Sequence, residues 1–139
     1  MAYVLSLRGG LWERRRAFSQ ASADYLKAMK EFPERPGAYN SFAWLVATRI
    51  FPERQSYKND ALEAANRAVS IRKHSDYLDT LACTYALVGD FDNAAAAERA
   101  ALEKLREEAP HDYQKVRAVF QARLAGFTAS VPKDCTGEE

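Results

Sequence analysis

The most reactive side chains of the sequence are two cysteines and two histidines, Cys83, Cys135, His74 and His111. None of them falls at the CxxC or Cys/His spacing that is typical of zinc sites. Cys83 and His74 could be read as a thiol and a base, but no third group is placed to orient the histidine. We therefore interpret Cys83 as a small packed or groove-lining residue, and we predict no catalytic, cofactor-binding or metal-binding site.

The cysteine count leaves the cellular compartment open. Two cysteines do not make a disulfide framework, and nothing around Cys135 indicates an activated thiol. No apolar run approaches the ~20 residues that span a bilayer, and the first twelve residues are a poor signal peptide. We expect a soluble protein, with the cytoplasm favoured over an exported fragment. The chain also begins within a structured pattern, which fits a piece of a longer protein.

Composition argues against nucleic acid as a partner. The 20 Lys and Arg residues almost cancel the 19 Asp and Glu residues, which gives a net charge of +1. Such a chain lacks the broad positive field that nucleic acid selects. The run Arg14 to Arg16 and the RGG at Arg8 lie inside a helical pattern, so we read them as a solvated hairpin tip. The P-loop, GxGxxG, HExxH and GxSxG signatures of common enzymes are missing from the sequence.

The chain repeats itself three times. Ala82, Tyr85, Ala94 and Ala101 have the same spacing as Gly9, Trp12, Ala21 and Ala28. The middle copy has Ala43, Val46, Ala61 and Ala68, with its two halves six residues further apart around residues 52–59. Periods of this length are typical of helical repeat arrays.

Each copy is predicted to form two helices. In the third copy, apolar residues recur at helical spacing up to Val88, Gly89 can end that helix, and Asp90 can cap the next. In the second copy, a helix that ends before Pro52 is followed by one from Asn59 or Asp60 to about residue 72. Small residues such as Gly9, Ala82 and Ala94 would lie where the two helices approach closely.

Three registered copies resemble the tetratricopeptide repeat. The matching residues are Leu5, Gly9, Trp12, Ala21, Tyr25, Ala28 and Pro33; then Tyr39, Phe42, Ala43, Val46, Ala61 and Ala68; then Leu78, Leu81, Ala82, Tyr85, Ala94 and Ala101. Glu98 stands where an aromatic residue is common. The stretches NSFAWLVAT and YLDTLACTYALVGDFDNA also resemble a bacterial subgroup of these repeats.

The resemblance implies an all-α, right-handed solenoid of helical hairpins over residues 1–127. The repeats would cover about residues 2–35, 36–74 and 75–110. A helix over about 112–126, with Tyr113, Val116, Phe120 and Leu124 on one face, would cap the stack. Residues 128–139 show no periodic pattern and are expected to form a mobile tail.

In such a solenoid the first helix of each hairpin lines a concave face, where partners bind. Among the inward positions implied by the resemblance, our candidates for a partner-binding groove are Asn40, Trp44, Thr48, Asp76, Asp79 and Cys83. The alternatives are that Trp44 only packs between hairpins and that Asp76 and Asp79 are only helix-start charges. Family members that grip a terminal carboxylate use basic groups at places that here hold Ser6, Gly10, Ser41, Asp76 and Thr80, so that activity is not expected.

The sequence therefore predicts a non-enzymatic scaffold that holds a peptide or partner protein in its groove, with no cofactor. Two alternatives remain open: a homo-oligomerising structural module, and a regulatory domain of a larger protein.

Overall fold

The computed structural model describes residues 2–138 and contains seven α-helices in this part of the chain. Met1 and Glu139, the ends of the predicted domain ranges, lie outside the described residues. The helices are α1 (Ala2–Arg14), α2 (Phe18–Glu31), α3 (Pro36–Thr48), α4 (Arg54–Ile71), α5 (Ser75–Leu87), α6 (Phe91–Glu108) and α7 (Tyr113–Phe127).

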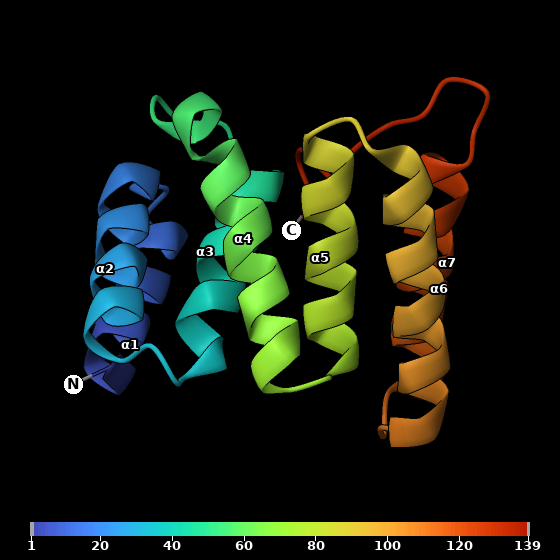
Figure 1. Cartoon of the computed structure of the whole chain (residues 1–139), viewed down its shortest axis with the longest axis horizontal. Helices are drawn as coiled ribbons and strands as arrows, with labels where there is room; N and C mark the ends of the chain where they lie inside the picture. The colour runs from blue at the N-terminus through green and yellow to red at the C-terminus, as the bar shows by residue number, and fades with distance from the viewer. Residues whose placement is uncertain (1, 139) are drawn as a thin grey trace.

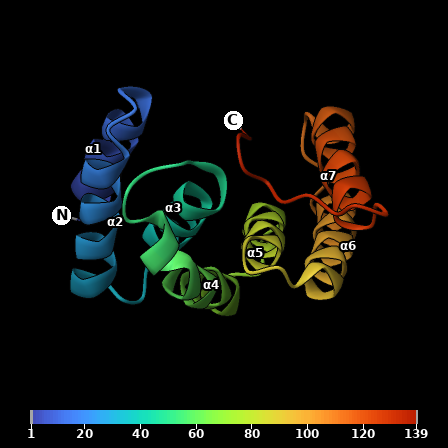
Figure 2. The same cartoon turned by 90° about the horizontal axis from the view of Figure 1, so that it is seen from above.

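The helices form three antiparallel hairpins that stand side by side, α1–α2, α3–α4 and α5–α6 (Figure 1). Viewed from above, α3, α5 and α7 lie on one side of the array and α4 and α6 on the other (Figure 2). Helix α7 packs against α6, where the first helix of a further hairpin would stand. The all-α hairpin solenoid expected from the sequence is confirmed.

Small residues lie at the helix contacts, as predicted. Ala82, Ala94 and Ala101 are completely buried. At Gly9, an added Cβ would come 2.5 Å from Cε1 of Tyr25, so α1 and α2 can approach only because this residue has no side chain. The alanine and glycine pattern therefore marks the places where the backbones come closest.

The turn of the third hairpin follows the prediction. Gly89 has a φ of +83°, a left-handed conformation in which glycine ends a helix without steric cost. The Asp90 side chain then accepts a hydrogen bond from the Asn93 backbone N–H at 3.2 Å, which caps α6.

The second helix of the middle hairpin begins earlier than predicted. We expected it to start at Asn59 or Asp60 after an expanded loop, but α4 starts at Arg54. Most of the six extra residues therefore extend the helix instead of forming a loop. Their effect is to bring Arg54 beneath the end of α3.

The segment after α7 lies against the solenoid, whereas the sequence predicted a mobile tail. It runs from α7 across the side that carries α3 and α5 (Figure 2). Cys135 forms a disulfide with Cys83 of α5 and is 1% exposed. The prediction of a mobile tail was wrong. The periodicity of apolar residues indicates helices, but it carries no signal for a segment held by one covalent bond and a few polar contacts.

Candidate binding groove

Three helices converge on a hollow in the concave face. Helix α3 contributes Asn40 and Trp44, and α5 and α7 contribute the rest. The cavity has a volume of about 290 Å³. Its lining residues are Asn40, Trp44, Asp76, Asp79, Thr80, Phe120 and Arg123.

Four of the six predicted groove residues meet in this hollow: Asn40, Trp44, Asp76 and Asp79. The other two, Thr48 and Cys83, are buried beside it under the C-terminal segment. Cys83 is no free groove-lining thiol, because it is disulfide-bonded. Asp79 is not an open helix-start charge either, since its side chain is 7% exposed.

An ion pair joins α5 to α7 at the floor of the hollow. Arg123 Nη1 lies 2.6 Å from Asp79 Oδ2, and both side chains are more than nine-tenths buried. The Arg123 guanidinium also lies 4.9 Å from the centre of the Trp44 ring, a distance at which a cation is attracted to the ring face. Trp44 is thereby held on one side, while it still borders the cavity.

A second acid, Glu98 of α6, is buried behind this ion pair. Burial is the largest cause that raises the pKa of Glu98, to about 11, and the neighbouring Asp79 raises it further. Burial also raises the pKa of Asp79, but Arg123 at 2.6 Å favours the ionised form of Asp79. The proton therefore resides on Glu98, and the Asp79–Arg123 pair stays charged.

Asn40 presents a hydrogen-bond acceptor without a protein partner. Its Oδ1 is buried, and none of the described residues donates to it. Buried polar atoms in proteins are nearly always hydrogen-bonded, so an unmatched one in a cavity wall marks a place where a ligand can bind.

The C-terminal segment covers the groove next to this hollow. The Gly137 backbone N–H donates to the Thr48 carbonyl at 2.8 Å, and Arg123 Nη2 lies 3.7 Å from Glu138 Oε2. Together with the Cys83–Cys135 disulfide, these contacts attach the segment to α3, α5 and α7. We call residues 128–138 the tail.

The end of the tail is folded into a turn. The Asp134 side chain accepts from the Thr136 N–H at 2.9 Å, and the Glu138 N–H donates to the Cys135 carbonyl at 3.0 Å. Gly137 has a φ of +89°, which this kind of turn assigns to glycine. The turn points the Gly137 N–H at Thr48 and the Glu138 carboxylate at Arg123.

Arg54 connects the tail with the end of α3. Its Nε donates to the Val46 carbonyl at 2.8 Å and its Nη2 to the Ala47 carbonyl at 3.1 Å and the Thr136 hydroxyl at 2.7 Å. These two carbonyls lie in the last turn of α3, where helix carbonyls lack intrahelical partners. The expansion of the middle repeat thus supplies a residue that contacts the tail.

The non-covalent contacts of the tail are few. A backbone hydrogen bond adds about 1 kcal/mol and a partly exposed ion pair about 0–1 kcal/mol, while ordering each residue costs about 1–2 kcal/mol. Val131 is 84% exposed, so little apolar burial adds to this balance. The disulfide is therefore the interaction that fixes the tail.

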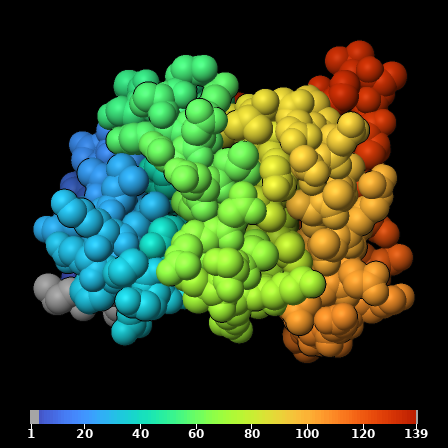
Figure 3. Space-filling view, viewed as in Figure 1, coloured from blue at the N-terminus to red at the C-terminus, as the bar shows by residue number. Residues whose placement is uncertain are grey.

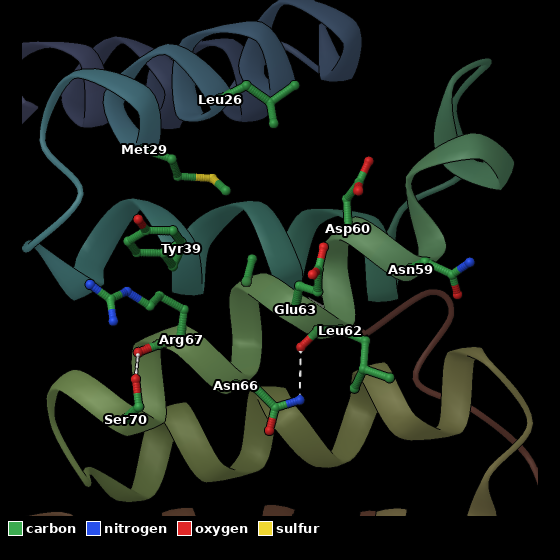
Figure 4. A pocket seen from close by; sticks show the side chains of 11 residues that line it. Leu26, Met29, Tyr39, Asn59, Asp60, Leu62, Glu63, Asn66, Arg67 and Ser70 are labelled. Atoms are coloured by element: carbon green, nitrogen blue, oxygen red, sulfur yellow. Dashed lines mark hydrogen bonds between the residues drawn. The ribbon is translucent and has the colours of Figure 1, made fainter.

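A larger hollow of about 1010 Å³ lies on the opposite face, between α2 and α4 (Figure 4). Leu26 and Met29 of α2 face α4 across it. Its polar side chains include Asn66 and Ser70, which donate to carbonyls of α4 itself. Figure 3 shows this face of the molecule, where the tail is visible only at one edge. Because no predicted site residue lines this hollow, we do not assign the binding site here.

Sequence reasoning missed Arg123, Arg54 and the buried state of Glu98. Arg123 lies three residues after Phe120, on the apolar face of the last helix, and Glu98 replaces an expected aromatic residue. A charged residue on a buried face indicates a charged partner. The sequence could therefore have indicated that α6, which carries Glu98, packs against α7, which carries Arg123. Arg54 carried no comparable signal, because it lay in a segment expected to be a loop.

Within residues 2–138, no group of three or more His, Cys, Asp or Glu side chains could hold a metal ion. Over the same residues, the helices are too short or too polar to cross a membrane.

No protein-family model matches the sequence, and no curated protein matches it. Solved structures do match. The first TPR domain of human RPAP3 is 18% identical with a TM-score of 0.67, over 94% of this chain and 97% of that chain. The first TPR of Spaghetti (RPAP3) bound to the HSP90 peptide SRMEEVD is 18% identical with a TM-score of 0.65, over 89% and 93%. The TPR domain of Sgt2 from Aspergillus fumigatus is 17% identical with a TM-score of 0.66, over 88% and 78%. This chain therefore has the fold of a tetratricopeptide-repeat domain.

Proposed function

We propose that the protein is a non-catalytic interaction module that binds a peptide segment of a partner protein in its concave groove. The observation that carries the proposal is the hollow between α3, α5 and α7, where the unmatched Asn40 Oδ1, the Trp44 ring and the Arg123 side chain meet. The Asn40 amide can hydrogen-bond with a peptide backbone, and an aromatic ring beside an arginine is typical of the centre of an interface.

The fold supports the same function. One solved structure with this fold contains a TPR domain bound to an HSP90 peptide, at 18% identity to this chain. The basic pair expected for a terminal-carboxylate clamp is missing from this sequence, so we propose a peptide site without that clamp.

The reactive side chains support a non-catalytic role. Cys83 and Cys135 are joined to each other, so neither is a free nucleophile. His74 Nδ1 accepts a hydrogen bond from the Asp76 backbone N–H at 3.1 Å, which is a helix-capping role.

The experiment is a selection of peptides from a random displayed library on the full chain, with and without a dithiol. Affinities of the selected peptides are then measured for the wild type, Trp44→Ala and Asn40→Ala. We expect each substitution to weaken binding at least tenfold, because each removes a group that faces the hollow. The matched control is Tyr39→Ala, a neighbouring α3 aromatic that faces the opposite hollow and should leave the affinity unchanged.

Asp79 is unsuitable for this test, because replacing a buried ion-pair partner destabilises the fold by about 3–5 kcal/mol. Selected peptides that bind Trp44→Ala and Asn40→Ala as tightly as the wild type would contradict the proposal.

Self-assembly is a second candidate function, favoured by one observation. Val4, Leu7 and Leu11 recur along the outer face of α1 and are 53%, 53% and 52% exposed. The corresponding faces of the later hairpins pack against a neighbouring hairpin. We therefore propose that a second copy of this chain covers the exposed face of α1. Sedimentation equilibrium of the wild type and Leu7→Gln tests it: a wild type that is monomeric at all concentrations contradicts this candidate.

We infer an oxidising compartment for this protein, in place of the expected cytoplasm. Disulfides persist in secreted and periplasmic proteins and are rare in cytosolic ones. Mass-spectrometric measurement of the Cys83–Cys135 disulfide in protein isolated under alkylating conditions tests this inference, and reduced thiols would contradict it.

A further inference from the structure

We propose that the concave face also binds a short peptide turn that carries a carboxylate, and that the protein's own tail occupies this site while the Cys83–Cys135 disulfide is intact. The inference rests on the proposed function and names both the chemical class of the ligand and the control of the site. Its basis is the way in which the tail contacts α3, α5 and α7.

The tail contacts the groove as a bound peptide would. Besides the Lys133 N–H, which donates to the Gly126 carbonyl of α7 at 3.1 Å, it supplies a backbone donor, Gly137 N–H to the Thr48 carbonyl, a buried side chain, Cys135, and a carboxylate, Glu138 beside Arg123. The turn over residues 135–138 presents these three groups on one side. A peptide from another protein with the same turn would find the same partners.

Two arginines set the preference for an acidic ligand. Arg123 lies 3.7 Å from Glu138, and Arg54 donates to the Thr136 hydroxyl and also interacts with the charge of Asp134. If the tail leaves, both guanidinium groups lose these contacts, and an acidic peptide would restore them. A basic peptide would instead bring like charge towards these guanidinium groups.

The disulfide is required to keep the tail bound to the helices. The other contacts of the tail are few, and much of the segment before Cys135 is exposed. Reduction by a dithiol breaks the S–S bond and leaves protonated thiols on Cys83 and Cys135, while the dithiol becomes a cyclic disulfide. Cys135 also lines a cavity of about 230 Å³ between α7 and the tail.

The test uses the full chain and a fluorescent peptide that covers residues 131–139 with serine in place of Cys135. Its affinity is measured for the oxidised wild type, the wild type with dithiol, and Cys135→Ser. We expect at least tenfold tighter binding by the two forms without the disulfide. Amide hydrogen exchange at Gly137 should likewise become at least tenfold faster in these forms, because the tail no longer stays bound.

Two changes test the chemistry of recognition. A peptide with glutamine in place of the residue that matches Glu138 should bind Cys135→Ser at least fivefold more weakly. Adding Arg54→Met to Cys135→Ser should weaken binding of the original peptide similarly. Adding Arg72→Met, which changes an exposed arginine at the end of α4, should leave the binding of this peptide unchanged.

Equal affinity for the oxidised and disulfide-free forms would overturn the inference, as would no binding to any form. Either result leaves the proposed function to be judged separately, by whether library-selected peptides depend on Trp44. If they do while the tail peptide fails to bind, only the inference about the tail is wrong.

Discussion

Three ionisable side chains, Asp79, Glu98 and Arg123, lie buried together between α5, α6 and α7. Arg123 compensates one carboxylate, so the other must hold a proton, and the pKa of Glu98 is raised to about 11. In the unfolded chain the pKa of this glutamate returns to about 4.5. Between these values the folded state binds one proton more than the unfolded state, so this residue lowers stability as the pH rises.

Glu98→Gln should therefore stabilise the protein at neutral pH. Glutamine keeps the shape and hydrogen-bonding ability of a protonated glutamate but requires no proton uptake on folding. We expect the free energy of unfolding at pH 7 to rise by about 1–3 kcal/mol, and its decrease between pH 5 and pH 9 to become shallower. Urea unfolding at several pH values measures both. A variant that is less stable than the wild type at pH 7 and equally pH-dependent would contradict this protonation state.

Gly9 and Gly10 are neighbours in α1 with opposite environments. An added Cβ at Gly9 would collide with the Tyr25 ring, while at Gly10 it would meet no atom within 4 Å. Gly9→Ala should lower the free energy of unfolding by about 1–3 kcal/mol, because the α1–α2 contact must widen. Gly10→Ala should raise it by about 0.5–1 kcal/mol, because alanine favours the helix. Thermal unfolding of both variants checks the prediction, and similar effects at the two positions would refute it.

At the scale of the elements, the six-residue expansion of the middle repeat lengthens α4 and brings Arg54 to the end of α3. Arg54 hydrogen-bonds two carbonyls there and the Thr136 hydroxyl of the tail. The expansion thus ties a helix end to a segment far away in the sequence.

Arg54→Met should lower the free energy of unfolding by about 1–3 kcal/mol, because the carbonyls of Val46 and Ala47 lose a charged donor. Hydrogen exchange should also accelerate at the end of α3. Arg72→Met is the charge-matched control and should change stability by less than about 0.5 kcal/mol. Equal effects of the two substitutions would show that Arg54 contributes nothing specific.

The hairpins could be predicted from the sequence because their determinants are local. Gly89 and Asp90 end one helix and start the next, and the alanines fix where the helices touch. The same register placed Asn40, Trp44, Asp76 and Asp79 on one face, where they line the hollow. The disulfide, the Asp79–Arg123 pair and the position of Arg54 depend on contacts between segments far apart in the chain, and periodicity does not encode them.

At the scale of the whole molecule, the disulfide closes a loop between residues 52 positions apart. It joins the end of the chain to the middle of α5 and so constrains the unfolded chain as well as the tail. Chain entropy for a loop of this size predicts a stabilisation of about 4 kcal/mol.

Cys135→Ser should therefore lower the free energy of unfolding by about 2–4 kcal/mol. A dithiol should lower the stability of the wild type to that of the variant and leave the variant unchanged. Denaturant unfolding of the two proteins, each with and without dithiol, checks this. Identical stability of the oxidised wild type and Cys135→Ser would mean that the two cysteines are not joined.

The two tryptophans allow a direct test of the concave face as the binding site. Trp44 borders the hollow between α3, α5 and α7, while Trp12 packs near α2. There the pKa of Asp24 is lowered chiefly by Arg8 and also by the Trp12 ring N–H. In a proton–nitrogen correlation spectrum, titration with a library-selected peptide should shift the indole signal of Trp44 and leave that of Trp12 in place. A shift of Trp12 without any change at Trp44 would contradict the binding groove assigned to this protein.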